Sequence, residues 1–143
     1  MDIRPREPVV RQEALQVRIV LDTHIVVQAA NDVLTPARKR LLEAESSELA
    51  LSAVTLWELT KLVELGYLAL PDGFERFMHY LCAHPRYEVV QYDAKLMIEL
   101  LQVAPKLHKD PADQIIVATA RTLDATLMTD DKRIRASKLV KVA

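Results

Sequence analysis

Cysteine and glycine are nearly absent from this chain of 143 residues. The single cysteine, Cys82, excludes an intramolecular disulfide and zinc sites of the four-cysteine kind. We expect it to be a buried free thiol, which suits a reducing compartment. The only two glycines, Gly66 and Gly73, argue against an all-β fold built on tight turns. They also exclude a G-x-x-x-x-G-K phosphate loop, because no lysine follows them in step.

The chain also lacks a strong net charge and a long apolar run. Its net charge of -1 and pI of about 6.4 exclude a protein that grips nucleic acid through overall charge. A nucleic-acid role would need a local basic rim or a bound cation. No stretch approaches the ~20 apolar residues that span a membrane, and the start, M-D-I-R-P-R-E-P, does not resemble a signal peptide. We therefore expect a soluble, cytoplasmic protein without a membrane partner.

What the chain does have is a hydrophobic content of 50%, enough for the core of one domain. Short apolar runs typical of buried parallel strands alternate with helical segments. The expected strands are Val17–Leu21, Glu48–Ser52, Tyr87–Tyr92, Ala125–Thr129 and, more weakly, Leu139–Val142. This alternation predicts an α/β fold, with a short parallel sheet of four to five strands covered by helices on both faces. Residues 1–16 show no period and are expected to be an N-terminal extension of a domain formed by residues 17–143.

Several helices carry their own boundary signals. Thr35 before Pro36, and Asp110 before Pro111, place a capping side chain ahead of a proline at the first helical position. The other expected signals are an Asp72/Glu75 capping box, a cap at Asp93 and a left-handed helix end at Gly66. In parallel sheets, functional residues gather where the strands end. The residues next to these strand ends are therefore the informative ones.

Acidic residues occupy these positions. Asp22 follows the first strand, Glu58 lies on the helix after the second, and Asp113 begins the helix that leads to the fourth. Asp131 follows the fourth strand itself. Two carboxylates ~5 Å apart repel by roughly 3 kcal/mol at an effective dielectric of 20, so four together require a cation or protonation. Carboxylate oxygens suit Mg²⁺ or Mn²⁺, and such a cluster without a phosphate loop favours phosphodiester hydrolysis.

Four segments carry a resemblance to a known family. They are L-D-T-H (21–24), S-A-V-T-L-W-E-L (52–59), H-K-D-P-A-D-Q-I-I-V-A-T-A (108–120) and L-M-T-D-D-K-R-I (127–134). Together they resemble the signature blocks of PIN-domain nucleases, above all the VapC-type toxins of type II toxin–antitoxin systems. The resemblance implies a three-layer α/β/α PIN fold over residues 17–143 and a Mg²⁺- or Mn²⁺-dependent endoribonuclease. It also implies a homodimer and an inhibitory antitoxin partner.

The family acids fall on particular residues of this chain. The resemblance assigns the catalytic and metal-binding roles to Asp22, Glu58, Asp113 and Asp131. The chain departs from the pattern by carrying an additional acid close to each of the last two. These are Asp110, which we interpret as a helix cap, and Asp130, which we interpret as a solvated neighbour pointing into water or toward Lys132.

Each acid also has a structural explanation. Asp22 and Asp131 can cap the helices that follow them, and Asp113 can interact with a helix dipole. Glu58 can close a capping box with Thr55. One further side chain has a supporting role: Thr129 is placed to orient a carboxylate. The structural explanations are jointly disfavoured because all four acids lie at one end of the sheet.

Other candidates are weaker or open. We leave His24 and His108 out of the site, because neither has a partner at metal-ligand spacing. Trp57 is interpreted as a core residue. Basic side chains flank the acids and either form an ordinary solvated surface or bind RNA phosphates: Lys106, Lys109, Lys132, Arg133 and Arg135. Surplus leucine on the segments 57–67 and 38–45 suggests a protein interface.

Two alternative functions belong to other classes. A degenerate PIN module would bind a partner without catalysis, although all four acid positions are filled here. A receiver-type signalling domain would bind Mg²⁺ beside an aspartate that follows the third strand. That aspartate would be Asp93, which we interpret as a helix cap, and Asp22 lacks the paired acid that such domains carry.

Overall fold

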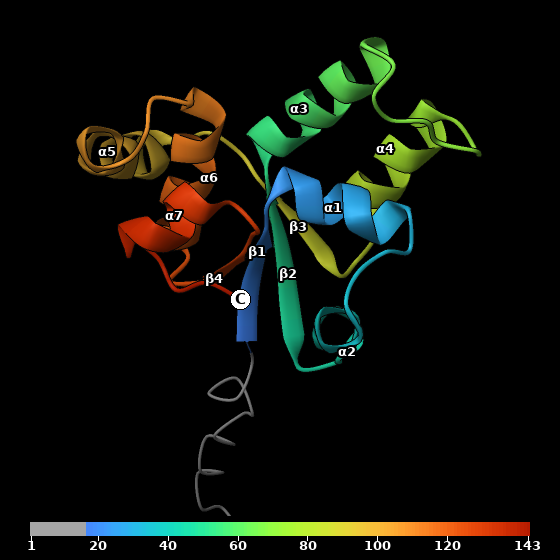
Figure 1. The fold of residues 1–143 in the computed structure, drawn as a ribbon, viewed down its shortest axis with the longest axis horizontal. Helices are drawn as coiled ribbons and strands as arrows, with labels where there is room; N and C mark the ends of the chain where they lie inside the picture. Colours follow the sequence, from blue (N-terminus) through green and yellow to red (C-terminus); the bar gives the residue numbers. More distant parts are fainter. Residues whose placement is uncertain (1–16) are drawn as a thin grey trace, which may run out of the picture.

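The computed structural model describes residues 17–143, so the expected extension at residues 1–16 lies outside the described part. A parallel four-stranded sheet in the order β3-β2-β1-β4 forms its centre (Figure 1). The strands are β1 (Val17–Leu21), β2 (Ser47–Ser52), β3 (Tyr87–Val90) and β4 (Thr126–Met128). The pairs Val20↔Ala50 and Val20↔Leu127 fix the register on both sides of β1. Because β1 is central, the residue that follows it lies in the middle of the carboxyl edge of the sheet.

Helices cover both faces of this sheet. Their bounds are α1 (Thr23–Ala30), α2 (Pro36–Glu43), α3 (Ala53–Glu64), α4 (Phe74–Ala83), α5 (Ala94–Val103), α6 (Pro111–Thr122) and α7 (Lys132–Ser137), with a 3₁₀ turn η2 (Ala104–Lys106). In Figure 1, α5, α6 and α7 lie on one side of the sheet and α1, α2 and α4 on the other. This arrangement confirms the predicted three-layer α/β/α fold with a short parallel sheet.

The strand predictions differ from the structure mainly at the ends. β1 has the predicted bounds, and β4 is shorter by one residue at each end. The weak fifth strand forms only an isolated bridge between Leu127 and Val142. At this bridge the Leu127 backbone N–H donates to the Lys141 carbonyl, and the Ala143 backbone N–H donates to the Leu127 carbonyl. The sheet therefore has four strands, the lower number of the four to five expected.

Most helix boundaries follow the predicted chemistry. Thr35, Asp93 and Asp110 each accept a backbone hydrogen bond at the start of their helix. Gly66, with φ +79°, follows the end of α3 as expected. The Asp72/Glu75 capping box was wrong. Gly73, with φ +90°, occupies the cap position of α4, and no side chain makes the capping bond.

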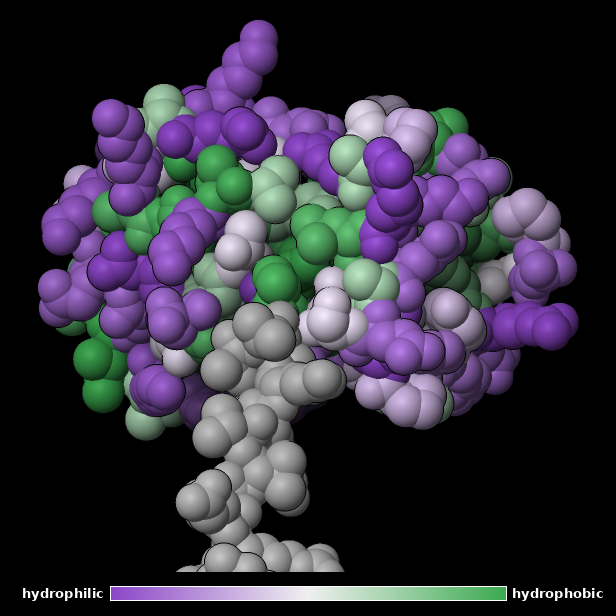
Figure 2. Space-filling view, turned by 90° about the horizontal axis from the view of Figure 1, so that it is seen from below, coloured by the Kyte–Doolittle hydropathy of each residue, from purple (hydrophilic) through white to green (hydrophobic). Residues whose placement is uncertain are grey.

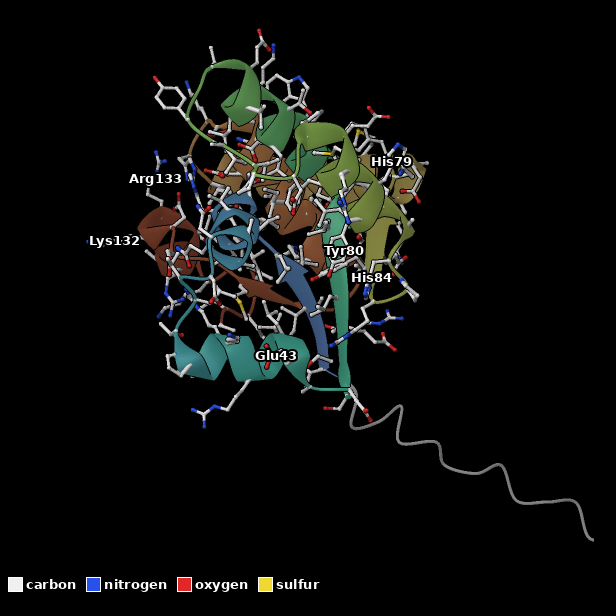
Figure 3. All side chains as sticks on the ribbon, turned by 90° about the vertical axis from the view of Figure 1, so that its right-hand side faces the viewer. Glu43, His79, Tyr80, His84, Lys132 and Arg133 are labelled. Atoms are coloured by element: carbon white, nitrogen blue, oxygen red, sulfur yellow. The ribbon has the colours of Figure 1, made fainter. Side chains whose placement is uncertain are left out.

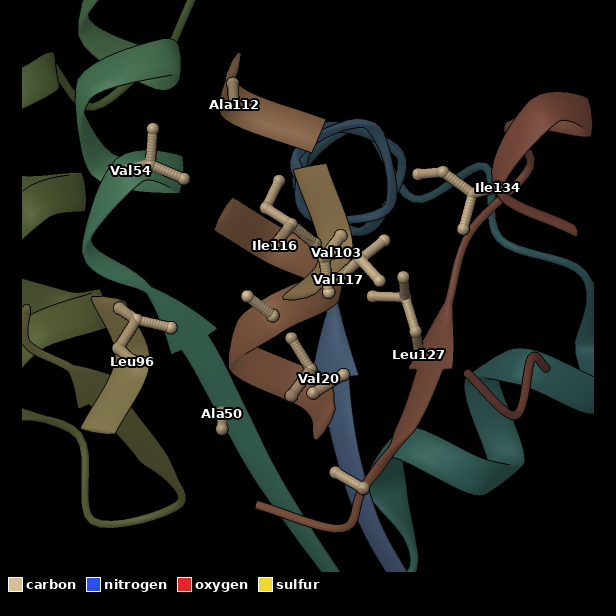
Figure 4. Close-up of a cluster of buried hydrophobic side chains, with 13 residues drawn as sticks. Val20, Ala50, Val54, Leu96, Val103, Ala112, Ile116, Val117, Leu127 and Ile134 are labelled. Carbon is tan, nitrogen blue, oxygen red and sulfur yellow. The ribbon is translucent and has the colours of Figure 1, made fainter. Parts of the chain in front are cut away.

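Two apolar clusters fill the space between sheet and helices. One packs Val20 and Leu127 against Val117 of α6 and Ile134 of α7 (Figure 4). The other, on the opposite face, joins the neighbouring strand residues to α1, α2 and α4: Ile19, Leu21, Leu49, Leu51, Met128, Ile25, Val26, Leu42 and Leu81. Alternate residues of β1 therefore face opposite layers, as expected for a strand buried on both faces. Figure 2 shows the lower face of the molecule, where apolar residues lie in the middle and hydrophilic residues lie on both flanks.

Three expectations about individual surfaces need correction or comment. Cys82 is exposed rather than buried, because it lies on the outer side of α4. Trp57 is 58% exposed and is not a core residue. Across residues 17–143, no helix is long and apolar enough to cross a membrane.

Candidate metal centre

Asp22 is the most buried acid of the described chain, with 4% of its surface exposed. It follows β1 directly and forms the N-cap of α1, with Oδ1 accepting a hydrogen bond from the Thr23 backbone N–H at 2.7 Å. Its Oδ2 accepts from the Thr129 hydroxyl at 2.6 Å. Burial raises the pKa of this carboxyl despite both hydrogen bonds. Asp22 therefore caps a helix and also belongs to the edge where we predicted the site.

Glu58 lies beside Asp22 but is not a capping residue. Helix α3 begins at Ala53 with Ser52 as its N-cap, so Thr55 and Glu58 are inside the helix and form no capping box. Glu58 Oε1 accepts a hydrogen bond from the Thr23 hydroxyl at 2.6 Å. Burial, followed by repulsion from Asp22 and Asp113, raises the pKa of the Glu58 carboxyl. The capping box that could have explained Glu58 is therefore not formed.

Asp113 lies in the first turn of α6 and contacts a histidine that we had left out. Its Oδ2 is 2.6 Å from His108 Nε2, and the two side chains are 13% and 14% exposed. The expected cap is also present, because Asp110 Oδ1 accepts from the Ala112 backbone N–H at 3.0 Å. Burial, followed by repulsion from Asp110 and Asp22, raises the pKa of Asp113. Sequence reasoning missed His108 because the relevant partner is a carboxylate five positions later, not a second histidine.

The last block separates two adjacent aspartates. Asp131 caps α7, with Oδ1 accepting from the backbone N–H groups of Arg133 at 2.8 Å and Ile134 at 2.9 Å. Its own backbone N–H donates to the Thr129 hydroxyl at 3.0 Å, so Thr129 joins Asp131 to Asp22. The expected orienting role of Thr129 therefore has a geometric basis.

Asp130 points to another side of the turn. It accepts hydrogen bonds from Arg38 Nη1 at 2.7 Å and Gln28 Nε2 at 2.8 Å. These bonds hold the pKa of Asp130 below its ordinary value. Asp130 is solvated as we expected, with 53% of its side chain exposed, but its charged partner is not Lys132. It forms an ion pair with Arg38 of α2.

Asp22, Glu58, Asp113 and Asp131 are called the acid cluster below. Ligand atoms of His108, Asp113 and Asp131 all lie within 4.8 Å of one another. Asp22 and Glu58 extend this group, since repulsion from Asp22 raises the pKa of Asp113, and repulsion from Asp22 and Asp113 raises the pKa of Glu58. Buried oxygen donors with raised pKa values gain from a divalent cation, which favours their ionised forms. The donor set therefore fits Mg²⁺ or Mn²⁺.

The five basic residues around the cluster are exposed. This exposure is expected both for an ordinary solvated surface and for a surface that binds RNA phosphates. Lys132 and Arg133 project from α7 and lie far from His79, Tyr80 and His84 in Figure 3. Arg133 approaches Asp131 Oδ2 at 3.8 Å. Arg135 instead donates to the Thr129 carbonyl at 3.0 Å, which ties α7 to the end of β4. Four of the five basic side chains are thus free to contact a polyanion, as far as the hydrogen bonds of residues 17–143 show.

Comparisons with known proteins agree with this geometry. The PIN domain family model matches residues 19–138. No curated protein sequence matches the chain. Among solved structures, the chain is similar to VapBC-1 from nontypeable Haemophilus influenzae, with 20% identity, a TM-score of 0.69, and coverage of 89% of this chain and 97% of that one.

Two further structures share the fold. VapBC2 from Rickettsia felis, bound to a promoter DNA fragment, gives 21% identity and a TM-score of 0.68, covering 89% of this chain and 98% of the other. FitAcB from Neisseria gonorrhoeae gives 21% identity and a TM-score of 0.59, covering 87% and 95%. The family match spans most of the chain and includes the whole acid cluster. The chain therefore belongs to the PIN domain family.

Proposed function

We propose that the chain is a divalent-metal-dependent endoribonuclease that acts as a VapC-like toxin. The observation that carries this proposal is the acid cluster, in which the buried carboxyl of Asp22 and the half-buried carboxyls of Glu58 and Asp113 have raised pKa values. A folded protein keeps such crowded charges at a cost, and a bound cation offsets that cost. PIN family membership and the similarity to VapBC structures support the same activity.

Each cluster residue has a role in this proposal. Asp22, Glu58, Asp113 and Asp131 hold Mg²⁺ or Mn²⁺ at the carboxyl edge of the sheet. Such an ion, when bound, lowers the pKa of a coordinated water and stabilises charge on a phosphoryl group. Two hydroxyls fix the carboxylates in place, since Thr129 donates to Asp22 and Thr23 donates to Glu58. Side chains held in this way lose little freedom when the ion arrives.

The substrate in this proposal is RNA. Lys132 and Arg133 are exposed at the start of α7, directly after the cluster residue Asp131, and Lys109 is exposed one residue before the Asp110 cap. Cations at these points neutralise phosphates on either side of the cluster. The cytoplasm, where cellular RNA is found, is the compartment in which we expect the protein to act.

The proposal includes two protein partners, a second copy of this chain and an antitoxin. The similarity to structures of VapBC, a family of toxin–antitoxin systems, supports an antitoxin partner. Exposed apolar side chains around α3 offer a surface: Trp57 is 58% exposed, Leu65 64% and Tyr67 79%. The second predicted surface was wrong, because Leu42 of α2 is buried in the core and Leu41 packs against it. The interface is therefore expected on the α3 side.

A receiver-type signalling domain is no longer a viable alternative, because the chain belongs to a different family and Asp93 caps α5 through the Leu96 N–H. The remaining alternative is a PIN module that binds RNA or antitoxin without cutting. A cleavage assay separates the two. Purified protein should cut structured RNA with Mg²⁺ or Mn²⁺ and stop when EDTA is added. Unchanged cleavage after exhaustive chelation, or no cleavage with either ion, would contradict the proposal.

A further inference from the structure

His108 lies in the segment between η2 and α6, where the structure fixes it from both sides. The preceding residue, Leu107, packs against the core cluster that contains Val117. Gln114 reaches back from α6, and its Nε2 donates to the His108 backbone carbonyl at 3.0 Å. The His108 side chain is only 14% exposed. A histidine held this firmly is not a surface residue that happens to lie near the cluster.

The contact between His108 and Asp113 is short and directional. Nε2 lies 2.6 Å from Asp113 Oδ2, a length typical of a hydrogen bond to an ionised partner. A carboxylate that holds a divalent cation is ionised, so the proton in this contact belongs to the imidazole. An Nε2 that carries and donates this proton has no free lone pair and cannot bind the metal at the same time.

The other ring nitrogen does not anchor the ring. Nδ1 is buried and makes no hydrogen bond within residues 17–143. The imidazole is thus held in place by its Asp113 contact and by packing, with nothing else to fix the ring. A buried nitrogen without a partner has a free-energy cost, and the structure retains the ring despite it.

We propose that His108 is a positioning residue that donates Nε2–H to Asp113 Oδ2 and aims the other carboxylate oxygen at the metal shared with Asp131. This inference rests on the proposed function, since it concerns the metal that the acid cluster would hold. Ligand atoms of His108, Asp113 and Asp131 all lie within 4.8 Å of one another, so an ion held by the two aspartates would lie close to this hydrogen bond. Partners of this kind typically change metal affinity by ~10- to 100-fold when removed.

The test is Mn²⁺ binding to the full-length metal-free protein, followed by calorimetry and by electron paramagnetic resonance. We expect His108→Ala to weaken Mn²⁺ binding by ~10-fold or more. His108→Gln should stay near wild type, because its amide N–H reaches the place of Nε2. His108→Asn should behave like alanine, because its shorter amide does not reach Asp113.

A matched control is His84→Ala. His84 is also half-buried and also uses a ring nitrogen, with Nδ1 accepting from the Arg86 backbone N–H at 3.2 Å. It lies on α4's side of the molecule, away from α7 (Figure 3). Its loss should lower thermal stability without changing Mn²⁺ affinity. If both alanine variants bound Mn²⁺ equally well, the positioning role would be wrong.

Spectroscopy distinguishes positioning from direct ligation. An imidazole bound to Mn²⁺ gives a nitrogen coupling in pulsed paramagnetic resonance spectra, and we expect none in the wild type. A coupling that disappears in His108→Ala would overturn the inference in favour of a direct ligand. Wild-type protein that binds Mn²⁺ without cutting RNA would refute the proposed function alone, because the affinity series would still test His108. Failure of the wild type to bind Mn²⁺ would overturn both.

Discussion

Carboxylates in this protein occupy two contrasting environments. Outside the acid cluster they pair with guanidinium groups, as Glu99 does with Arg121 and Asp130 with Arg38. In the acid cluster the partners are mostly hydroxyls and backbone N–H groups, together with the His108 ring. Among the described residues, the one guanidinium paired with a cluster carboxylate is that of Arg133, which is 65% exposed and lies 3.8 Å from Asp131 Oδ2. Ion pairs neutralise such carboxylates outside the acid cluster. Within residues 17–143, no lysine or arginine nitrogen lies within hydrogen-bond distance of a cluster carboxylate.

The pKa directions follow this difference. Hydrogen bonds from Gln28 and Arg38 lower the pKa of Asp130, whereas burial raises that of Asp22 even though Thr129 and Thr23 donate to it. Hydrogen bonds alone thus do not balance the loss of water around a carboxylate. Among the described carboxyl groups, those with raised pKa values are Asp22, Glu58 and Asp113, and all three belong to the acid cluster.

Removing a charge from the cluster should have the largest effect. We expect Asp22→Asn to lower RNA cleavage by at least ~1000-fold, or about 4 kcal/mol in transition-state free energy. The metal-free variant should melt at a higher temperature than wild type at neutral pH, because repulsion is relieved and the amide oxygen still caps α1. Single-turnover cleavage and thermal melts measure the two effects. A metal-free variant that unfolds more easily would show that Asp22 acts mainly as a cap.

The adjacent aspartates provide an internal control. Asp131→Asn keeps the oxygen that caps α7 but loses charge, so Mn²⁺ affinity should fall by ~10- to 100-fold and cleavage should fall with it. Asp130→Asn should cut RNA normally and lose at most about 1 kcal/mol of stability, because its pair with Arg38 is half exposed. If Asp130→Asn lost cleavage and Asp131→Asn did not, our assignment of the metal-binding aspartate in this segment would be wrong by one residue.

The paired environment should respond in the opposite way. Glu99→Gln removes the charge partner of Arg121, and both side chains are largely buried between α5 and α6. We expect a loss of about 1–3 kcal/mol in the free energy of unfolding, because a partly buried guanidinium loses its counter-ion. Cleavage and Mn²⁺ affinity should not change. Denaturant titration measures the first effect, and a fall in Mn²⁺ affinity would indicate that the two environments are coupled.

The smallest effect concerns pH. The pKa values of Asp22, Glu58 and Asp113 are raised above their ordinary values of 3.8, 4.5 and 3.8. The folded state therefore holds protons that the unfolded state releases, and this stability is lost as pH rises through the raised values. Metal-free protein should thus melt at a slightly higher temperature in mild acid than at neutral pH. This dependence of melting temperature on pH should be weaker in Asp22→Asn. If the variant kept the full dependence, groups other than Asp22 would be its cause.

Much of the fold could be predicted because local chemistry and global position agree. The apolar run Val17–Leu21 is a strand with those bounds, and Thr35, Asp93 and Asp110 cap helices as their side chains favour. The errors arose where two signals competed. Asp72 offered a cap, but the positive φ of Gly73 ended the loop one residue later. The apolar segment Leu139–Val142 had strand character but pairs with β4 through one bridge only.

The candidate site was less accessible from the sequence, because its details depend on contacts between distant segments. The four acids could be gathered at one edge by counting strands, but the Thr23–Glu58 bond requires α1 and α3 to pack together. Asp130 could not be assigned to Arg38, which lies 92 positions earlier in the chain. His108 carried no spacing signal, because no second histidine lies at metal-ligand spacing from it and a carboxylate five positions later was not considered as its partner.

One bond has a consequence for how the protein is made in the cell. The Thr129 hydroxyl and the Asp22 carboxylate are 107 positions apart in sequence, and Asp131 follows Thr129. A growing polypeptide emerges from its amino end at roughly 5–20 residues per second, so Asp22 waits several seconds for these companions. Fragments released by premature termination before β4 would lack Thr129 and Asp131 altogether. Synthesis interrupted before β4 would therefore yield pieces without a complete acid cluster, and under the proposed function any cutting of RNA would begin only after β4 and Asp131 have been made.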